Sequence, residues 1–301
     1  AQAILAQDRL RGGSGRSISM ADAEGKRHGA SAEREVVLTM EGAVATIRLN
    51  RPSKYNAFRE IDTQTVQKYL TNCADDASIG AVVLTGTGLY YSAGADIFSM
   101  AQLCRPSTLR AKMTEYNQGI FDMFIDFPKP IITAVNGPAI GMAVTSATLT
   151  DYVLASSTAT FQTPFAKLGL PPEGCSSFNF PRLFGEENAQ MLLRDAAKID
   201  AATALRIGLV HEVLEPSALL PRAQAVANEW VAQGRMRTIV QEGLVEKLRF
   251  VNAEESVAFG AATTERRFYE AQLRLAKEQG KSSMAWAWWA AAKIVPLVSR
   301  L

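Results

Sequence analysis

The chain has 301 residues, 48% of them hydrophobic and 21% charged, so it can bury a substantial core in one large domain or two modest ones. Its formal net charge is only +2, which gives no electrostatic support for binding to nucleic acid or to a membrane surface. The 3 cysteines are widely spaced and indicate a reducing compartment, and 2 histidines are too few for a histidine-rich metal site. We therefore expect neither nucleic acid nor a bound metal as a partner.

The two ends of the chain differ in composition from the rest. Residues 1–33 mix small and charged residues without apolar periodicity and without a signal-peptide pattern, which predicts a mobile N-terminal arm. No apolar run reaches the ~18 residues of a membrane helix, so we expect no membrane span. The last three residues, Ser299-Arg300-Leu301, are similar to the Ser-Lys-Leu signal for the peroxisome, because arginine keeps the positive charge of lysine.

Strands and helices are predicted to alternate along the first half of the chain. Two β-branched runs joined by Glu41-Gly42 predict a hairpin over residues 36–39 and 44–49. Beyond the hairpin, the apolar pattern predicts helix 61–73, strand 81–85, helix 109–126, strand 130–135, helix 139–149 and strands 152–155 and 160–162.

Helices dominate the second half. They are predicted over residues 175–184, 187–195, 201–207, 219–233 and from 238 onward, with one short strand at 210–213. The alternation of strands and helices predicts an α/β fold with mostly parallel strands. No linker-like segment divides residues 35–235, so we expect one core domain over 34–235 and a helical C-terminal region over 236–301.

Glu173 is the one carboxylate in an otherwise apolar or neutral run, residues 170–177. Two prolines stiffen its approach and a glycine frees the backbone after it. A carboxylate held away from water has a raised pKa, which is how a glutamate becomes a proton-transfer base. The local sequence alone nevertheless favours a solvent-exposed turn, because the prolines and the glycine are typical of turns.

Two glycine turns follow the predicted central strands, one at residues 91–97 and one at 136–143. At such a junction of strand and helix the backbone N–H groups are free and the helix dipole is positive. Two N–H groups that converge on one point form an oxyanion hole, although each turn taken alone is more often scaffolding. Asp96 is expected to cap a short helix after Ala95. A third turn, at Gly86-x-Gly88, lacks the further residues of a dinucleotide or P-loop fingerprint.

Together these motifs resemble the crotonase (enoyl-CoA hydratase/isomerase) superfamily over roughly residues 35–300. The matching segments are Ser92-Ala-Gly-Ala-Asp-Ile97, Asn136-Gly-Pro-Ala-Ile-Gly141, the hairpin end Leu49-Asn-Arg-Pro52 with Asn56-Ala57, and Ala204 with Gly208-Leu-Val210. The resemblance implies a crotonase-like spiral of ββα units with a helical C-terminal trimerisation region. It also implies an acyl-CoA thioester as substrate, no separate cofactor, and a homotrimer or dimer of trimers. The oxyanion donors that it implies are the backbone N–H groups of Ala95 and Met142.

The acids and bases divide this superfamily by reaction. Its hydratases use two glutamates, and the matching positions here hold Thr145 and Phe165. Residues 163–169 and 172–177 resemble the peroxisomal Δ3,Δ2-enoyl-CoA isomerase branch, in which the position of Glu173 holds the single catalytic base. The resemblance therefore implies that the chain converts 3-enoyl-CoA to trans-2-enoyl-CoA in fatty-acid β-oxidation. An enoyl-CoA hydratase and a non-catalytic acyl-CoA-binding protein on the same fold are the alternatives.

The resemblance also implies a set of substrate-binding positions. They are Lys54, Asn56, Ala57, Ser92, Ala93, Gly94, Asp96, Ile97, Gly141, Phe165 and Pro172. Lys54 and Lys293 are candidates for the CoA phosphates, but a solvated surface position is an equally good interpretation of each. We expect structural roles for Cys175, which has no histidine near it in sequence, and for His211.

Overall fold

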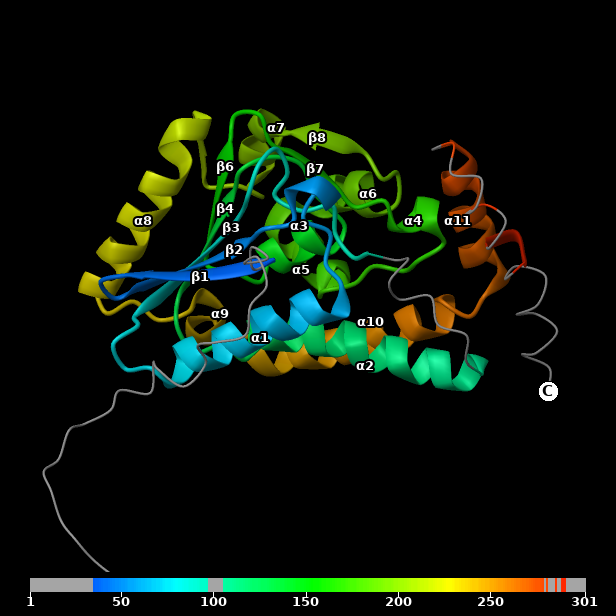
Figure 1. Ribbon diagram of the computed structural model, residues 1–301, viewed down its shortest axis with the longest axis horizontal. Helices are drawn as coiled ribbons and strands as arrows, with labels where there is room; N and C mark the ends of the chain where they lie inside the picture. Colours follow the sequence, from blue (N-terminus) through cyan, green and yellow to red (C-terminus); the bar gives the residue numbers. More distant parts are fainter. Residues whose placement is uncertain (1–34, 97–104, 279, 281–284, 286–287, 291–301) are drawn as a thin grey trace, which may run out of the picture. The chain divides into compact units, whose positions relative to one another are not determined.

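The computed structural model describes residues 35–96, 105–278, 280, 285 and 288–290. A six-stranded sheet lies at the centre of this part of the chain (Figure 1). The strand order is β1-β2-β3-β4-β6-β9. The strands are β1 Val36–Glu41, β2 Val44–Leu49, β3 Ala81–Gly86, β4 Ile131–Val135, β6 Tyr152–Ser156 and β9 Glu212–Leu214. β1 and β2 form the predicted antiparallel hairpin, and every other neighbouring pair is parallel. The predicted α/β class is confirmed.

A second, three-stranded sheet corrects two predictions. It consists of β5 Ala139–Ile140, β7 Thr160–Gln162 and β8 Lys198–Asp200, in the order β5-β7-β8. The helix predicted from residue 139 begins only at Met142, as α3 Met142–Ala147. Gly141, at φ 59° and ψ −123°, separates strand from helix in a conformation that side chains disfavour. β8 was not predicted, since three residues carry no periodic signal and depend on pairing with β7.

The other helices are the 3-10 helix η1 Pro52–Lys54, and α1 Glu60–Asp75, α2 Pro106–Ile125, α4 Phe165–Leu168, α5 Ser176–Phe184, α6 Glu186–Leu193, α7 Ala201–Ile207, α8 Pro216–Ala232, α9 Thr238–Gln241, α10 Val245–Ala262 and α11 Arg266–Glu278. Most agree with their predicted positions to within a few residues. The short helices η1 and α4 were not predicted, and the helix predicted from residue 238 onward is divided into α9, α10 and α11. β9 begins two residues after the predicted start of the last strand. Among the described residues no helix is both long and apolar enough to cross a membrane.

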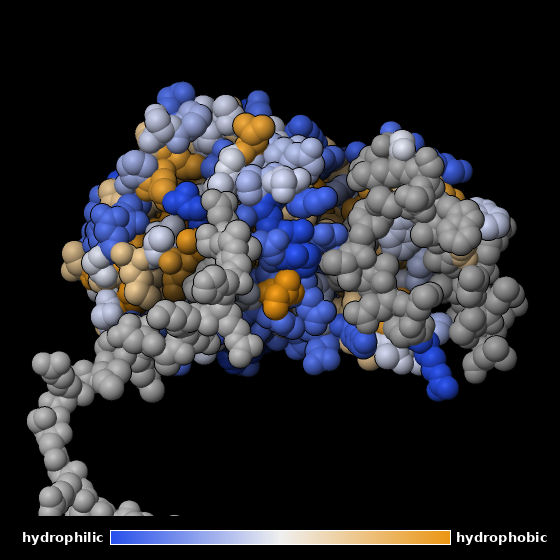
Figure 2. All heavy atoms as spheres, in the orientation of Figure 1, coloured by the Kyte–Doolittle hydropathy of each residue, from blue (hydrophilic) through white to orange (hydrophobic). Residues whose placement is uncertain are grey.

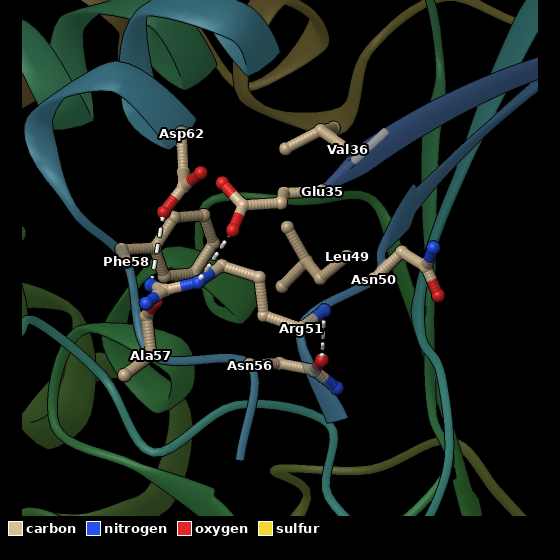
Figure 3. A pocket seen from close by; sticks show the side chains of 9 residues that line it. All are labelled: Glu35, Val36, Leu49, Asn50, Arg51, Asn56, Ala57, Phe58 and Asp62. Atoms are coloured by element: carbon tan, nitrogen blue, oxygen red, sulfur yellow. Dashed lines mark hydrogen bonds and ion pairs between the residues drawn. The ribbon is translucent and has the colours of Figure 1, made fainter. Parts of the chain in front are cut away.

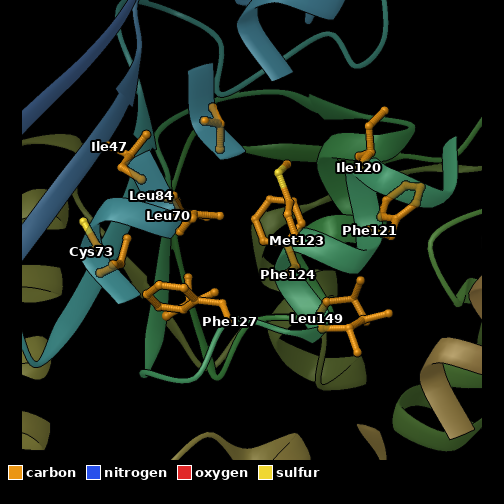
Figure 4. Close-up of a cluster of buried hydrophobic side chains, with 14 of the residues drawn as sticks. Ile47, Leu70, Cys73, Leu84, Ile120, Phe121, Met123, Phe124, Phe127 and Leu149 are labelled. Atoms are coloured by element: carbon orange, nitrogen blue, oxygen red, sulfur yellow. The ribbon is translucent and has the colours of Figure 1, made fainter. Parts of the chain in front are cut away.

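Helices cover both faces of the large sheet, so all six residues of β3 are buried. Alternate residues face opposite ways. Val83 packs in a cluster with α8, whereas Val82 and Leu84 belong to a second cluster that includes side chains of α1 and α2 (Figure 4). α1 buries one stripe at helical spacing, and the face it turns outward is mostly hydrophilic (Figure 2). α10 lies along α2 and belongs to the same layer of helices, whereas α11 lies beside α4 (Figure 1).

Arg237 ties the C-terminal helices to the core through a fully buried ion pair. Its Nε donates to Asp151 Oδ2 at 2.6 Å, and its terminal nitrogens donate to three backbone carbonyl oxygens at 2.5–2.7 Å. Asp151 also accepts hydrogen bonds from the N–H groups of Ile131 and Thr238. Both side chains are 0% exposed, so each charge depends on the other for compensation.

Replacing Arg237 with alanine is expected to lower the free energy of unfolding by about 3–5 kcal/mol, because it leaves Asp151 charged, buried and unpaired. Arg249→Ala is the matched control. Arg249 pairs with Asp126 at 2.7 Å, but both side chains are 47% exposed, so a loss of about 0–1 kcal/mol is expected. Urea unfolding of the two variants measures the difference, and equal losses would contradict this account of Arg237.

The predicted boundaries at residues 33/34 and 235/236 stay predictions. The N-terminal arm lies outside the described residues. At the other end, Phe268, Tyr269 and Trp288 form a small aromatic cluster, with the rings of Phe268 and Trp288 perpendicular and 5.9 Å apart. Leu170, the first residue of the run that carries Glu173, packs against this cluster. The C-terminal helices thus contact the segment in which the candidate base lies.

Candidate active site

Two glycine turns meet at the carboxyl ends of the parallel strands β3 and β4. Their backbones run side by side: Ser92 and Ala139 form a parallel bridge, and the N–H of Ile140 donates to the Ser92 carbonyl at 3.0 Å. On the other side of the first turn, the N–H of Phe58 donates to the Gly94 carbonyl at 2.8 Å. Three segments far apart in sequence therefore form one short backbone platform beside the sheet.

The N–H groups of Ala95 and Met142 are the donors that the sequence predicts. Within the described part of the chain, no backbone hydrogen bond outside regular helices and strands uses either N–H. Met142 is the first residue of α3, where a helix leaves its N–H groups without intrahelical partners. The turns approach closely, because a methyl group added to Gly94 would lie 2.5 Å from the Ile140 carbonyl oxygen and 3.8 Å from the Met142 nitrogen. Free N–H groups on two adjacent turns are what an oxyanion hole requires.

Two asparagine side chains hold these turns. Asn56 is 2% exposed; its Oδ1 accepts a hydrogen bond from the Arg51 N–H at 2.9 Å, and its Nδ2 donates to the Thr87 carbonyl at 2.9 Å. Asn136 Oδ1 accepts from the N–H of Gly86, also at 2.9 Å. Asn56 was predicted to be a substrate-binding position, and that contact stays a prediction. Its side-chain amide is engaged with backbone groups, so it fixes the shape of the turn.

Glu173 is buried, with 7% of its surface exposed. The prediction of a solvent-exposed turn, which the local sequence favours, is therefore wrong. Its Oε2 accepts a hydrogen bond from Asn117 Nδ2 at 2.7 Å. Burial raises the pKa of Glu173 to about 8; the Asn117 hydrogen bond lowers it and the charge of Glu255 raises it further. The carboxyl group is thus a base suited to proton transfer near neutral pH.

Asn117 lies on α2 and was not found by sequence reasoning. It occupies the buried stripe of that helix, four residues after Met113 and three before Ile120, where an apolar residue is expected. Ser256 Oγ donates to Asn117 Oδ1 at 2.9 Å, which turns the Nδ2 donor toward Glu173. A polar residue in an otherwise apolar stripe was the only signal available, and it did not identify a partner 56 residues away.

Thr145 and Phe165 are the residues that the resemblance places at the positions of the two hydratase acids. Thr145 is fully buried in α3, and its Oγ1 would lie 2.8 Å from a methyl group on Gly174, the residue after Glu173. Phe165 is buried at the start of α4, with a ring carbon 3.8 Å from the methyl position of Gly141. Both side chains therefore border the site, and neither carries a charge.

Arg51 lies in a shallow pocket beside the first turn (Figure 3). Its guanidinium group contacts Asp62 at 3.2 Å and Glu35 at 3.5 Å, and donates to the Ala57 carbonyl at 2.6 Å. Its charge is therefore balanced by carboxylates of the same chain. Ala57, predicted to bind substrate, lines this pocket, and Lys54 in η1 is exposed to solvent.

The other predicted positions are distributed around the turns. Ser92 is fully buried; its Oγ donates to the Asn56 carbonyl and accepts from the Gly94 N–H. Ala93, in the first turn, is half-buried. Pro172, next to Glu173 in sequence, is also half-buried. Asp96 is also half-buried, but Ile97 and the helix that Asp96 was expected to cap lie outside the described residues.

Cys175 and His211 have structural contacts, in agreement with the roles predicted for them. Cys175 is fully buried, and its thiol donates to the Leu248 carbonyl at 3.2 Å. Burial also raises the pKa of the Cys175 thiol, which keeps it protonated and poorly nucleophilic. His211 Nδ1 accepts a hydrogen bond from the Val153 N–H at 3.0 Å, at the edge of β6.

Comparison with protein families supplies the classification. Residues 39–283 match the family model described as Enoyl-CoA hydratase/isomerase. The chain belongs to the enoyl-CoA hydratase/isomerase family. This confirms the resemblance that the two glycine turns carry. A solved family member, an enoyl-CoA hydratase/isomerase from Pseudoalteromonas atlantica T6c, has a TM-score of 0.70 and 26% identity over 82% of this chain and 98% of that chain. The predicted crotonase-like fold is confirmed.

The family relatives include both isomerases and hydratases. The chain is 35% identical over 260 residues to the peroxisomal enoyl-CoA delta isomerase 3 of Mus musculus, covering 80% of this chain and 79% of that protein. It is 38% identical over 230 residues to the enoyl-CoA delta isomerase 2 of Homo sapiens, covering 73% of this chain but only 57% of that protein. A crotonyl-CoA hydratase of Syntrophomonas wolfei is 32% identical over 232 residues, covering 75% and 88%.

Proposed function

We propose that the protein is a Δ3,Δ2-enoyl-CoA isomerase that converts 3-enoyl-CoA to trans-2-enoyl-CoA, with Glu173 as both acid and base. The observation that carries the proposal is the buried Glu173 carboxyl group, whose pKa is raised to about 8. The uncharged Thr145 and Phe165, at the positions of the two hydratase acids, support it. Similarity to two enoyl-CoA delta isomerases supports it further.

In the proposed mechanism the Glu173 side chain transfers the proton, and backbone N–H groups stabilise the charge that forms on the thioester oxygen. The Glu173 carboxylate removes a proton from C2 of the 3-enoyl thioester, and the electron pair delocalises onto the thioester oxygen. The N–H groups of Ala95 and Met142 donate hydrogen bonds to that oxygen, each donor contributing about 2.7–4 kcal/mol. Glu173, now protonated, returns the proton at C4, and the double bond comes to lie between C2 and C3. No water is consumed, so a dry pocket suits this reaction.

The proposal extends to assembly and location. The acyl-CoA thioester brings its own CoA group, so we propose no separate cofactor, and Lys54 is a candidate for contact with the CoA phosphates. We also propose a homotrimer or a dimer of trimers, built through the C-terminal helical region. A peroxisomal location is supported by the similarity to the peroxisomal mouse relative. A role in fatty-acid β-oxidation follows from the substrate.

Product analysis with purified protein tests the proposal. Incubation with 3-enoyl-CoA is expected to yield 2-enoyl-CoA, and incubation with 2-enoyl-CoA is expected to yield little 3-hydroxyacyl-CoA. Hydratase activity is the second candidate, because the Syntrophomonas relative is named a crotonyl-CoA hydratase. Rapid formation of 3-hydroxyacyl-CoA would favour that candidate. Tight binding of acyl-CoA without either product would identify a non-catalytic binding protein.

The raised pKa of Glu173 predicts how activity and stability vary with pH. Glu173 must be ionised to remove the C2 proton, so kcat/KM is expected to rise with pH until about 8 and then to level off. Between pH 4.5, the usual pKa of a glutamate, and about pH 8, Glu173 keeps its proton in the folded state. In the unfolded chain the same group has lost its proton over this pH range. The contribution of Glu173 to stability is therefore full below that window and is lost as the pH rises through it.

The variant Glu173→Gln removes this titration and isolates its effect on stability. Urea unfolding of wild type and variant across the same window measures the difference. The stability of the variant relative to wild type is expected to increase with pH, since the wild type must bury a charge. A difference that does not change with pH would show that Glu173 does not titrate with a raised pKa in the folded state.

A further inference from the structure

Glu255 is a second buried carboxylate beside the segment that carries Glu173. It lies on α10, is 7% exposed, and is separated from Glu173 by 82 residues of sequence. Its Oε2 accepts a hydrogen bond from the Cys175 N–H at 2.7 Å, and its Oε1 accepts one from the Ser177 N–H at 2.8 Å. One side chain of α10 therefore holds the backbone both two and four residues after Glu173.

The backbone that Glu255 holds is unusual in conformation. Gly174 has φ 65° and Cys175 has φ 62°, so two consecutive residues adopt the left-handed region. For a residue with a side chain, such as Cys175, this conformation costs roughly 1–2 kcal/mol. It persists where the surroundings over-determine it. Here three hydrogen bonds to α10 hold it: the two to the Glu255 side chain, and the one from the Cys175 thiol to the Leu248 carbonyl.

Glu255 and Glu173 also differ in the hydrogen bonds that their carboxyl groups accept. Burial raises the pKa of Glu255, and the hydrogen bonds that both of its oxygens accept from backbone N–H groups lower it. Both oxygens are therefore engaged with the backbone just after Glu173. Glu173, by contrast, has one side-chain hydrogen bond, from Asn117. A second carboxylate at the site therefore does not by itself restore the pair of acids that the hydratases use.

We propose that Glu255 is a positioning residue for the isomerase reaction: through the backbone of residues 175–177 it fixes where the Glu173 carboxylate lies relative to the substrate. This inference rests on the proposed function of the site. Two titratable groups are coupled to Glu173 from the elements packed around it, Tyr116 on α2 and Glu255 itself on α10. Burial, with the charge of Glu173 as a smaller cause, raises the pKa of Tyr116 to about 12, so Tyr116 is neutral at the pH of interest. Glu255 is the group whose negative charge raises the pKa of Glu173.

Glu255→Gln tests the proposal, with Glu254→Gln as the matched control on the exposed face of the same helix. The glutamine has one acceptor oxygen in place of two, so one N–H loses its partner and Glu173 is displaced. We expect kcat to fall about 10- to 100-fold with KM within about twofold, since small misplacements of a reacting group carry losses of that order. Removal of the charge also moves the rising limb of the pH profile to lower pH. Glu254→Gln is expected to change none of these.

Two further measurements keep the test decisive. Glu255→Asp retains the charge but has a side chain that is one methylene shorter. It is expected to lower kcat and to leave the rising limb of the pH profile in place. This variant keeps the proposal testable if Glu255→Gln does not fold. A carbon-13 NMR titration of the glutamate carboxyl groups, with the Glu173 signal assigned by its absence in Glu173→Gln, follows the Glu173 charge without any substrate. Wild-type kcat in Glu255→Asp, together with an unmoved Glu173 titration in Glu255→Gln, would overturn the proposal. If the wild type does not isomerise 3-enoyl-CoA but the titration still moves, the proposed function fails and the coupling of the two glutamates stands.

Discussion

Glu173→Gln is expected to fold and to bind acyl-CoA like the wild type, and to lose isomerisation of 3-enoyl-CoA by about 10²–10⁴-fold, the contribution typical of a general acid–base group. Glutamine has the shape of glutamic acid, and its carbonyl oxygen can still accept the hydrogen bond that Asn117 now donates at 2.7 Å. The variant therefore removes the proton acceptor and little else. Steady-state conversion of 3-enoyl-CoA, followed as formation of the conjugated 2-enoyl thioester, measures the loss.

Two controls separate loss of the base from loss of the fold. Glu187→Gln changes an exposed carboxylate on α6 and is expected to leave turnover unchanged. Acyl-CoA affinity of Glu173→Gln, measured by calorimetry, is expected to remain within a few-fold of wild type, because the N–H groups of the glycine turns are untouched. Near-wild-type turnover in Glu173→Gln would remove the basis for the isomerase assignment.

Gly94→Ala is expected to lower kcat/KM by about 10²–10³-fold, equivalent to the loss of one oxyanion donor. Gly94 has φ 82°, and the new methyl group would lie 2.5 Å from the carbonyl oxygen of Ile140. Either turn must move to relieve this contact, which separates the N–H groups of Ala95 and Met142. The same assay of 3-enoyl-CoA conversion measures the effect.

Gly42→Ala is the matched control for the cost of a left-handed backbone. Gly42 has φ 59° in the turn between β1 and β2, and an added methyl group meets nothing within 4 Å. Its replacement is expected to cost roughly 1–2 kcal/mol of stability and to leave kcat/KM unchanged. If Gly94→Ala and Gly42→Ala had the same effect on turnover, the close approach of the two turns would not matter for the reaction.

The sequence predicted most of the fold because its elements have strong local signals. β-branched runs such as those of β3, and apolar stripes such as that of α1, fix an element whatever surrounds it. β8 and the strand β5 at Ala139 were missed, because two or three residues become a strand only through partners far away in sequence. Gly141 could have indicated the break before α3, since glycine at a positive φ ends one element and starts another.

The candidate site was predicted where a motif carries it and missed where tertiary contacts build it. The turns around Gly94 and Gly141 and the position of Glu173 follow from short motifs. Asn117, which contacts the Glu173 side chain, lies on α2, and Glu255, which contacts the backbone of Cys175, lies on α10; neither has a motif around it. The local sequence of Glu173 even favoured solvent, because burial is decided by the helices that pack over a turn and not by the turn itself.

The proposed mechanism requires that one shielded carboxylate move the same proton from C2 to C4. Turnover of 3-enoyl-CoA in D₂O shows whether it does, when deuterium at C4 of the product is measured by NMR from the first turnovers. Since Glu173 is 7% exposed, the proton that it removes is expected to return to C4 before it exchanges, so C4 should contain clearly less than one deuteron per product molecule. One full deuteron at C4 from the first turnover would mean that the proton comes from solvent or from a second acid, and that Glu173 does not carry the proton from C2 to C4.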